Sequence, residues 1–324
     1  MQLMSVLPYA VYALCAGAAG YWNPIPQPTE AGYAPIHHFR GVFENDSVSG
    51  QDCNYTHGTR LDYAQITPDG NAWGLSLTQN IYTPETHTHH RVEGQHPYCG
   101  YMALGAAYIK RGVDFGCATE LQIGTTGRAS LAGQIQNGLH DMFGMETWDG
   151  WRDQIRSEVT LQLTSRQEWR ARWLEKAPAA GWESDGTVYL RESLGTFHVG
   201  GGVGVTYRFG RNLPTSSQVT GNSPTVFGVS ALRKPGYKPA AMSYFLVLEG
   251  SLNYVARDLT VDGGVFHDFQ RSCERTPWQP EGRLGGCVIY RGVEYYMGAL
   301  VRGRTYKTQD ENAVLGTFSI TWHW

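Results

Sequence analysis

Short runs of alternating apolar and polar residues recur from Gly41 to the end of the chain, and they constrain the fold more than any other feature. Successive side chains of a β-strand point to opposite faces, so a period of two is typical of strands rather than helices. Glycine, proline, asparagine and aspartate separate the runs, as they do in turns. Counting the weaker runs, we expect roughly ten to fourteen strands. The clearest runs are 59–65, 72–78, 101–108, 116–123, 157–163, 196–207, 243–248, 251–255, 295–301 and 316–324.

An all-β chain of 324 residues can be a soluble β-sandwich or a membrane-spanning barrel. Charged residues make up 17%, and glycine (40) and tyrosine (19) are abundant, which suits a barrel with a lipid-facing wall. The final run, TFSITWHW, alternates up to an aromatic last residue, as is common in outer-membrane barrels. Aromatic residues near strand ends predict interfacial girdles. They are Tyr82, Tyr108, Trp148, Trp151, Trp169, Trp173 and Tyr207. These features favour the barrel.

The start of the chain differs from the rest. Residues 1–20 carry no charge and contain a short apolar run that ends on small residues, which predicts a secretory signal peptide, although Pro8 interrupts the run. Residues 21–40 are rich in proline, which cannot donate to a strand ladder, so we expect an irregular lead-in there. We expect one barrel domain over 41–324. No other apolar stretch is long enough for a spanning helix, so a membrane-spanning chain of this kind would have to be a closed barrel.

Charge and cysteine spacing argue against two classes of partner. The net charge of −3 provides no basic surface for nucleic acid. The six cysteines show no CxxC or Cys/His spacing typical of zinc sites. Removal of Cys15 with the signal peptide would leave five, and sequence does not determine their pairing. Two pairs are conceivable, Cys99 with Cys117 and Cys273 with Cys287.

One segment departs from the strand pattern. Across 130–144 the apolar residues recur at helical spacing, which predicts an amphipathic helix of about four turns. Ser130 can cap its start and Gly144 its end. The apolar stripe consists of Leu131, Ile135, Leu139, Met142 and Phe143, and we expect it to pack on the barrel wall or its rim. His140 falls off this stripe, on the same face as Gln136, and spacing alone leaves it open as a surface residue or a functional one.

Polar residues near the first strands and after the predicted helix could take part in catalysis or bind a metal. Asn45 and Asp46 could bind a hard cation through oxygen, or could form an ordinary Asx turn. Thr56 opens the next strand and could donate to an oxyanion. Glu146 could reach a metal or hold His140 in position. The histidines at 87, 89, 90 and 96 indicate a loop rather than a metal site, and no GxSxG motif is present.

Several of these segments together resemble the outer-membrane lipid A 3-O-deacylases. The motifs are FENDSVSGQD, NYTHG, RLDY, QNIYTPE and IGTTGRASLAGQIQNGLHDMFGMETWDGWRDQI. The resemblance runs from about Gly41 to Trp324, and the segment 123–155 carries most of it. It implies a twelve-stranded antiparallel barrel with a site between its wall and a helix in an extracellular region. It also implies calcium-dependent removal of the ester-linked 3-prime acyloxyacyl chain of lipid A.

The resemblance also implies a role for each motif residue. Asp46 would ligate Ca²⁺ beside Asn45, and Thr56 would lie near the oxyanion site. His140 would be the general base and Glu146 an essential acid beyond it. The expected partner is lipid A or lipopolysaccharide, for a chain integral to the bacterial outer membrane and more often a monomer than an oligomer. Three alternatives stay open: an outer-membrane phospholipase, a non-enzymatic barrel or channel, and a soluble periplasmic β protein.

Overall fold

The computed structural model describes residues 36–50, 53–68, 70–86, 90, 92–179, 181–214, 221–234, 240–267 and 273–324. Its strands are β1 (Ile36–Asn45), β2 (Asn54–Ile66), β3 (Ala72–Thr83), β4 (Cys99–Lys110), β5 (Phe115–Thr126), β6 (Val159–Arg170), β7 (Lys176–Ala179), β8 (Trp182–Gly195), β9 (His198–Arg211), β10 (Met242–Asp258), β11 (Trp278–Tyr290), β12 (Val293–Arg302) and β13 (Ala313–His323). Its α-helices are α2 (Ala132–Met142) and α3 (Leu259–Asp262). Its 3₁₀ helices are Asp46–Ser49, Gly127–Ser130, Asp149–Asp153 and Arg172–Leu174.

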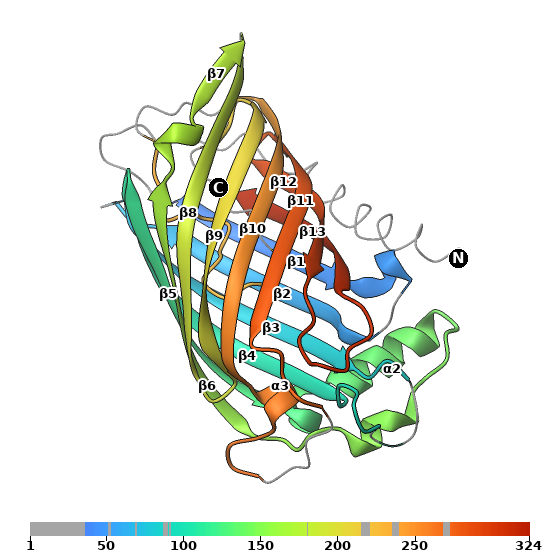
Figure 1. Cartoon of the computed structure of the whole chain (residues 1–324). Coiled ribbons are helices and arrows are strands. Elements are labelled where there is room, and N and C mark those ends of the chain that lie inside the picture. The colour runs from blue at the N-terminus through green and yellow to red at the C-terminus, as the bar shows by residue number, and fades with distance from the viewer. Residues whose placement is uncertain are drawn as a thin grey trace.

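The strands form one closed antiparallel barrel (Figure 1). Consecutive strands pair with each other except β6 and β7; β6 pairs instead with β8, and β1 pairs with β13, so the wall has no free edge. The short β7 pairs only with the start of β8 and projects beyond the wall, which leaves twelve wall strands among the described residues. This confirms the predicted all-β barrel of about twelve strands.

Two boundaries differ from the sequence prediction. β1 begins at Ile36, five residues before the expected start of the barrel at Gly41, so the end of the proline-rich lead-in belongs to the wall. The runs 243–248 and 251–255 are parts of the single strand β10. The predicted signal peptide (1–20) and residues 21–35 lie outside the described residues.

Side chains alternate between the two surfaces of the wall. The outward positions are apolar and exposed, as a lipid-facing surface requires. They include Leu61, Leu75, Leu77, Leu104, Leu121, Ile123, Leu161, Leu163, Val203, Val205, Leu246, Leu248, Leu284 and Met297. The inward positions are largely polar and buried, and include Arg40, Arg60, Asp62, Ser76, Thr78, Glu120, Gln122, Gln162, Thr164 and Arg166. None of the described helices is long and apolar enough to cross a membrane.

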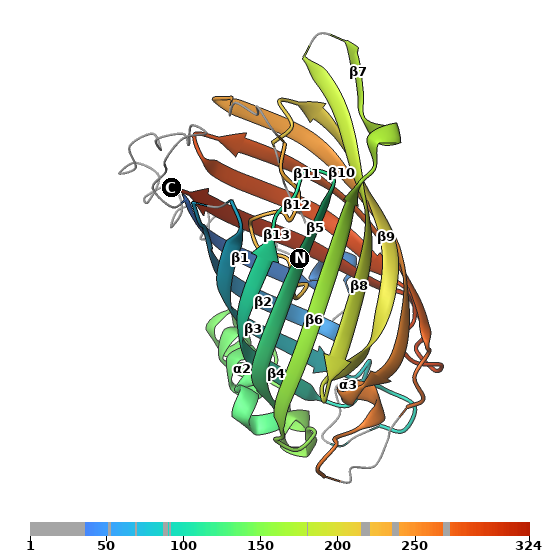
Figure 2. The same cartoon turned by 90° about the vertical axis from the view of Figure 1, so that its left-hand side faces the viewer.

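The two ends of the barrel differ. β1 starts and β13 ends at the same end, where His37 and Trp324 exchange backbone hydrogen bonds of 2.7 and 2.9 Å. Most turns at that end are short, as between β2 and β3 or β11 and β12, apart from the connection between β9 and β10. The opposite end carries longer connections, including the one with α2 (Figures 1 and 2). Outer-membrane barrels have short periplasmic turns and longer extracellular loops, so α2 lies at the extracellular end.

The helix predicted across 130–144 is present, but its orientation differs from the prediction. α2 follows the 3₁₀ turn Gly127–Ser130, and Gly144 adopts the left-handed conformation just beyond the helix, as predicted. The buried face contains Ala132, Gly133, Gln136 and His140. Within the apolar stripe, three residues are instead exposed: Leu131, Leu139 and Met142. The expected packing of the stripe on the wall is therefore wrong for most of its length.

Trp148 and Trp151 are buried beneath α2 rather than placed in a girdle, whereas Tyr108, Trp169 and Trp173 are exposed as predicted. Cys99, Cys117 and Cys287 carry free thiols, so neither of the two conceivable disulfides is formed.

Candidate active site

α2 lies against the outer surface of the wall, over β3 and β4 (Figure 2). Gly100 of β4 makes this approach possible, because a Cβ atom there would lie 2.0 Å from Ser130 Oγ and 2.3 Å from Ala132 Cβ. Gln79 of β3 also donates from Nε2 to the carbonyl oxygen of Ser130 at 2.9 Å. An apolar cluster completes the contact, formed by Ile81, Tyr98, Ala132, Trp148 and Trp151, with Ile135 packed against it. The helix is thus fixed to the wall from outside.

His140 lies on the buried face of α2 and is 8% exposed. Its Nδ1 is 2.6 Å from the carbonyl oxygen of Glu146, and its ring meets Trp148 edge-on with centroids 4.9 Å apart. A carbonyl oxygen only accepts hydrogen bonds, so Nδ1 carries the proton and donates it. In the neutral imidazole this leaves Nε2 with the lone pair. The structure therefore holds His140 in the tautomer that a general base at Nε2 requires.

Glu146 contributes through its main chain. Its carbonyl oxygen orients His140, while its side chain is exposed. Of the two roles considered for this residue, holding His140 is thus performed by the backbone, and the carboxylate is left accessible.

Gln136 is a site residue to which the sequence assigned no role. It is buried one helical turn before His140, and its Oε1 accepts a hydrogen bond of 2.9 Å from Trp151 Nε1. This contact ties α2 to the segment that follows it. The four-residue spacing from His140 was the available signal, since residues at that spacing share one helix face.

Asn45 and Asp46 end β1 and begin a 3₁₀ turn. Asn45 caps that turn, because its Oδ1 accepts from Ser47 N at 2.9 Å, which is the Asx-turn geometry. Its Nδ2 donates to the carbonyl oxygen of Thr56 at 3.2 Å. Asp46 is 1% exposed, and its Oδ2 accepts from Cys53 N at 2.7 Å. Asn45 therefore acts as a scaffold that joins Asp46 to Thr56.

Thr56 lies at a β-bulge. The register between β2 and β3 shifts between Tyr55 and His57, so Thr56 is an extra residue on its strand. Bulges re-aim a side chain out of the regular pleat. Here the Thr56 hydroxyl lies 2.5 Å from the hydroxyl of Thr83 at the end of β3. On the same strand, Ile81 packs beneath α2. β3 thus links the Asn45–Thr56 group to the helix that carries His140.

The donor chemistry around Asp46 is compatible with a hard cation. Among the described residues, no three His, Cys, Asp or Glu side chains gather into a metal-binding group. A cation at Asp46 would therefore take most of its other ligands from neutral oxygens, such as backbone carbonyls, hydroxyls, water or substrate. Calcium accepts such mixed oxygen shells, whereas structural zinc requires nitrogen or sulfur ligands. A buried aspartate fits as an anionic ligand in such a shell.

Comparison with known proteins gives a family match over nearly the whole chain. The family described as outer membrane protein LpxR matches residues 7–324. The solved structure of LpxR from Salmonella typhimurium superposes with a TM-score of 0.74 at 16% identity, covering 89% of this chain and 99% of that one. The β domain of the Bordetella autotransporter BrkA superposes with a TM-score of 0.42 at 9% identity, covering 90% of this chain and 98% of that one. No curated protein matches.

Proposed function

Because the chain belongs to the LpxR family of outer membrane proteins, a lipid A-modifying family, we propose that it is a lipid A 3-O-deacylase. The reaction is hydrolysis of the ester that links the 3-prime acyloxyacyl chain to the sugar. The observation that carries this proposal is the setting of His140, whose Nδ1 is fixed by the Glu146 carbonyl on a helix that packs against the outer wall. A site on the outside of the barrel suits a lipid substrate, which reaches it from the membrane rather than through the lumen.

His140 acts as the general base. Nε2 removes a proton from water as the water oxygen forms a bond to the ester carbonyl carbon. The bond from that carbon to the sugar oxygen then breaks, and the proton returns to the sugar oxygen. The products are the free acyloxyacyl acid and lipid A with a 3-prime hydroxyl. No covalent enzyme intermediate is needed, which agrees with the missing nucleophile motif.

Thr56 stabilises the negative charge that develops on the carbonyl oxygen. In the contact with Thr83, one hydroxyl donates and the other accepts. When Thr83 donates, the hydroxyl proton of Thr56 is available to the substrate. A donor already positioned for the oxyanion is the most effective form of such stabilisation.

Asp46 would hold Ca²⁺, with the accessible carboxylate of Glu146 as a further ligand or as a contact to the bound lipid. When bound, the cation supplies an electrophile that polarises the ester carbonyl. Asn45 supports this arrangement indirectly, because its side chain fixes both the turn after Asp46 and the backbone of Thr56.

Mass spectrometry of lipid A incubated with the refolded protein tests the proposal. We expect loss of one acyloxyacyl unit with calcium, no loss with a chelator, and no loss for His140→Ala. Asp141→Asn, an exposed neighbour on the same helix, is the matched control and should remain active. A parallel assay on glycerophospholipid vesicles separates a phospholipase. Intact lipid A in every sample of folded protein would reject the deacylase.

A further inference from the structure

Residues 221–234 belong to the connection between β9 and β10 and lie inside the barrel. They contain a run of buried side chains, although this connection joins the two strands at the periplasmic end. Eight strands enclose a lumen that wall side chains just fill, and sixteen leave an aqueous channel. A twelve-stranded wall lies between these cases. Whether its lumen conducts therefore depends on what else occupies it.

The wall is shaped to receive this segment. Phe227 is fully buried against small lumen-facing residues near the periplasmic ends of β2 to β5. These are Ala64, Ala72, Ala107 and Ala118. A Cβ atom at Gly74 would lie 2.8 Å from the Phe227 ring, and one at Gly116 would lie 2.0 Å from the carbonyl oxygen of Ala231. A barrel lumen is ordinarily lined by polar groups. This apolar pocket is therefore suited to the apolar side chains of the segment rather than to water.

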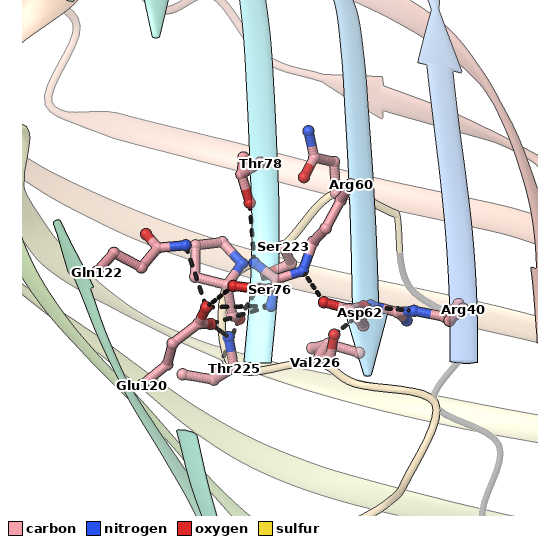
Figure 3. Close-up of polar contacts among 12 residues, drawn as sticks. Arg40, Arg60, Asp62, Ser76, Thr78, Glu120, Gln122, Ser223, Thr225 and Val226 are labelled. Atoms are coloured by element: carbon pink, nitrogen blue, oxygen red, sulfur yellow. Dashed lines mark hydrogen bonds and ion pairs between the residues drawn. The ribbon is translucent and has the colours of Figure 1, made fainter. Parts of the chain in front are cut away.

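A buried cluster of charged side chains from the wall binds the backbone of the segment at Thr225 and Val226 (Figure 3). Arg60 pairs with Asp62 at 2.6 Å and with Glu120 at 3.1 Å, and all three side chains are at most 1% exposed. Glu120 Oε2 accepts from Thr225 N at 2.6 Å, and Arg40 donates to the carbonyl oxygen of Val226. The backbone of the segment thereby supplies hydrogen bonds that buried charges need.

Thr225 adopts a φ of 64°, in the left-handed region that a β-branched residue rarely occupies. Such strained conformations persist where the surroundings determine them. The residue with this strained backbone is also the one whose N–H donates to Glu120, so the contact with the wall helps to hold the conformation.

Further contacts join the segment to β8 and β13 as well as to β3 and the turn between β4 and β5. Asn222 Nδ2 donates to Asn80 Oδ1 at 2.5 Å, and Arg191 of β8 donates to Ser223 Oγ at 3.3 Å. A Cβ atom at Gly228 would lie 2.6 Å from Thr321 Cγ2 of β13. At the periplasmic turn between β4 and β5, Gly112 N donates to the carbonyl oxygen of Ala231 at 2.9 Å. The segment therefore spans the cross-section of the lumen.

On the extracellular side a cavity of about 220 Å³ remains, and most of the residues that line it are polar or charged. Asn222, Ser223 and Pro224 line it from the segment, and Thr305 and Gln309 line it from an extracellular connection.

We propose that residues 221–234 are a fixed plug that closes the barrel to ions and solutes, so that the cavity above it is a blind pocket. The plug is separate from the proposed active site, which lies outside the wall. A protein with this plug performs no transport through its lumen.

Ion conductance across planar lipid bilayers in potassium chloride tests the plug. We expect no current steps from the wild type, and steps from a variant in which 221–234 is replaced by a short Gly-Ser linker. The matched control replaces residues 172–181, which include β7, at the same end of the barrel but outside the lumen. This control should remain closed. Heat-modifiable electrophoretic mobility establishes that each variant is a folded barrel.

A pair of point variants tests the same proposal without deletion. Thr225→Pro removes the N–H that meets Glu120 and cannot adopt the positive φ, so it should release the plug and produce current steps. Thr225→Gly retains the N–H and accepts that φ, so it should remain closed. Current steps of equal size in the wild type and in the linker variant would overturn the proposal. So would a folded linker variant that stays closed, or equal conductance of the two Thr225 variants.

Discussion

At the scale of single residues, the main chain of Glu146 contacts His140, whereas its side chain is exposed and free to interact with a ligand. Its carbonyl oxygen orients His140, so replacing the side chain leaves that contact in place. We expect Glu146→Gln to raise the calcium concentration needed for half-maximal deacylation and to leave the pH dependence of the rate unchanged. Calcium titrations and pH profiles of both proteins measure this. A shifted pH profile at unchanged calcium requirement would show that the carboxylate acts on His140 instead.

Thr83 offers a second test at this scale. Its hydroxyl is 2.5 Å from that of Thr56, and in the proposed mechanism it positions the oxyanion donor. Removing a donor to the oxyanion costs about 10²–10³ in rate, and removing the partner that orients it should cost less, about tenfold in kcat. Thr83→Val should show this loss with little change in KM, and Thr83→Ser should restore the rate. Equal losses for Val and Ser would indicate a packing role.

The motif residues could be found in the sequence because their types and spacings are distinctive. How they act could be found only in part. The Asx turn at Asn45 was one of the two readings of that segment, but its second hydrogen bond, to the Thr56 backbone, was not foreseen. Glu146 was expected to hold His140 as one of two roles, but it does so through its main chain, which no side-chain pattern indicates. Thr83 was missed because its contact with Thr56 arises from a β-bulge, and register is a property of two strands rather than one.

At the scale of elements, the strands were predicted best where polar and apolar residues alternate, as in β2 to β6. Among the wall strands, β1, β8 and β11 match none of the clearest runs. β1 begins within the proline-rich lead-in, β8 carries charged residues through its length, and β11 contains Pro280 and several glycines, which resemble turn residues. The orientation of α2 was wrong for a physical reason. The amphipathic rule assumes water outside the protein, whereas a helix beside a lipid-facing wall can expose its apolar stripe and pack its small and polar face inward.

Close packing of α2 on the wall leads to a prediction for Gly100. Gly100→Ala would place a Cβ atom 2.0 Å from Ser130 Oγ and displace the helix. We expect deacylation to fall by at least about tenfold, since small misplacements of catalytic groups are costly. Gly138→Ala adds the same methyl group to α2 where nothing lies within 4 Å, and should stay active. Lipid A mass spectrometry and electrophoretic mobility of both variants provide the comparison. Full activity of Gly100→Ala would show that the contact does not position the site.

At the scale of the whole molecule, the lumen contains a charge cluster that is neutral as a unit. Arg40 and Arg60 are balanced by Asp62 and Glu120, and all are at most 3% exposed. Removing one member of a buried pair leaves a charge uncompensated and costs about 3–5 kcal/mol. We expect Arg60→Ala to lower the free energy of unfolding by that amount, measured by urea titration in lipid vesicles. Arg128→Ala, at an exposed arginine, is the control and should change it little. An equal loss of unfolding free energy in the two variants would contradict the assignment of Arg60 to a buried, charge-balanced cluster.

The position of the plug also has a consequence for how the barrel is made. Residues 221–234 contact β1 to β5, β8 and β13 from within, yet they precede β11, β12 and β13 in the chain. The wall closes where β13, the last strand, pairs with β1, the first. The strands on either side of the segment, β9 and β10, have these ends at the periplasmic opening, so residues 221–234 can enter the lumen through that opening. Their contacts with Arg40 of β1 and Thr321 of β13 join the two strands of the closing seam, so the packing of the plug is complete only once the last strand is in place.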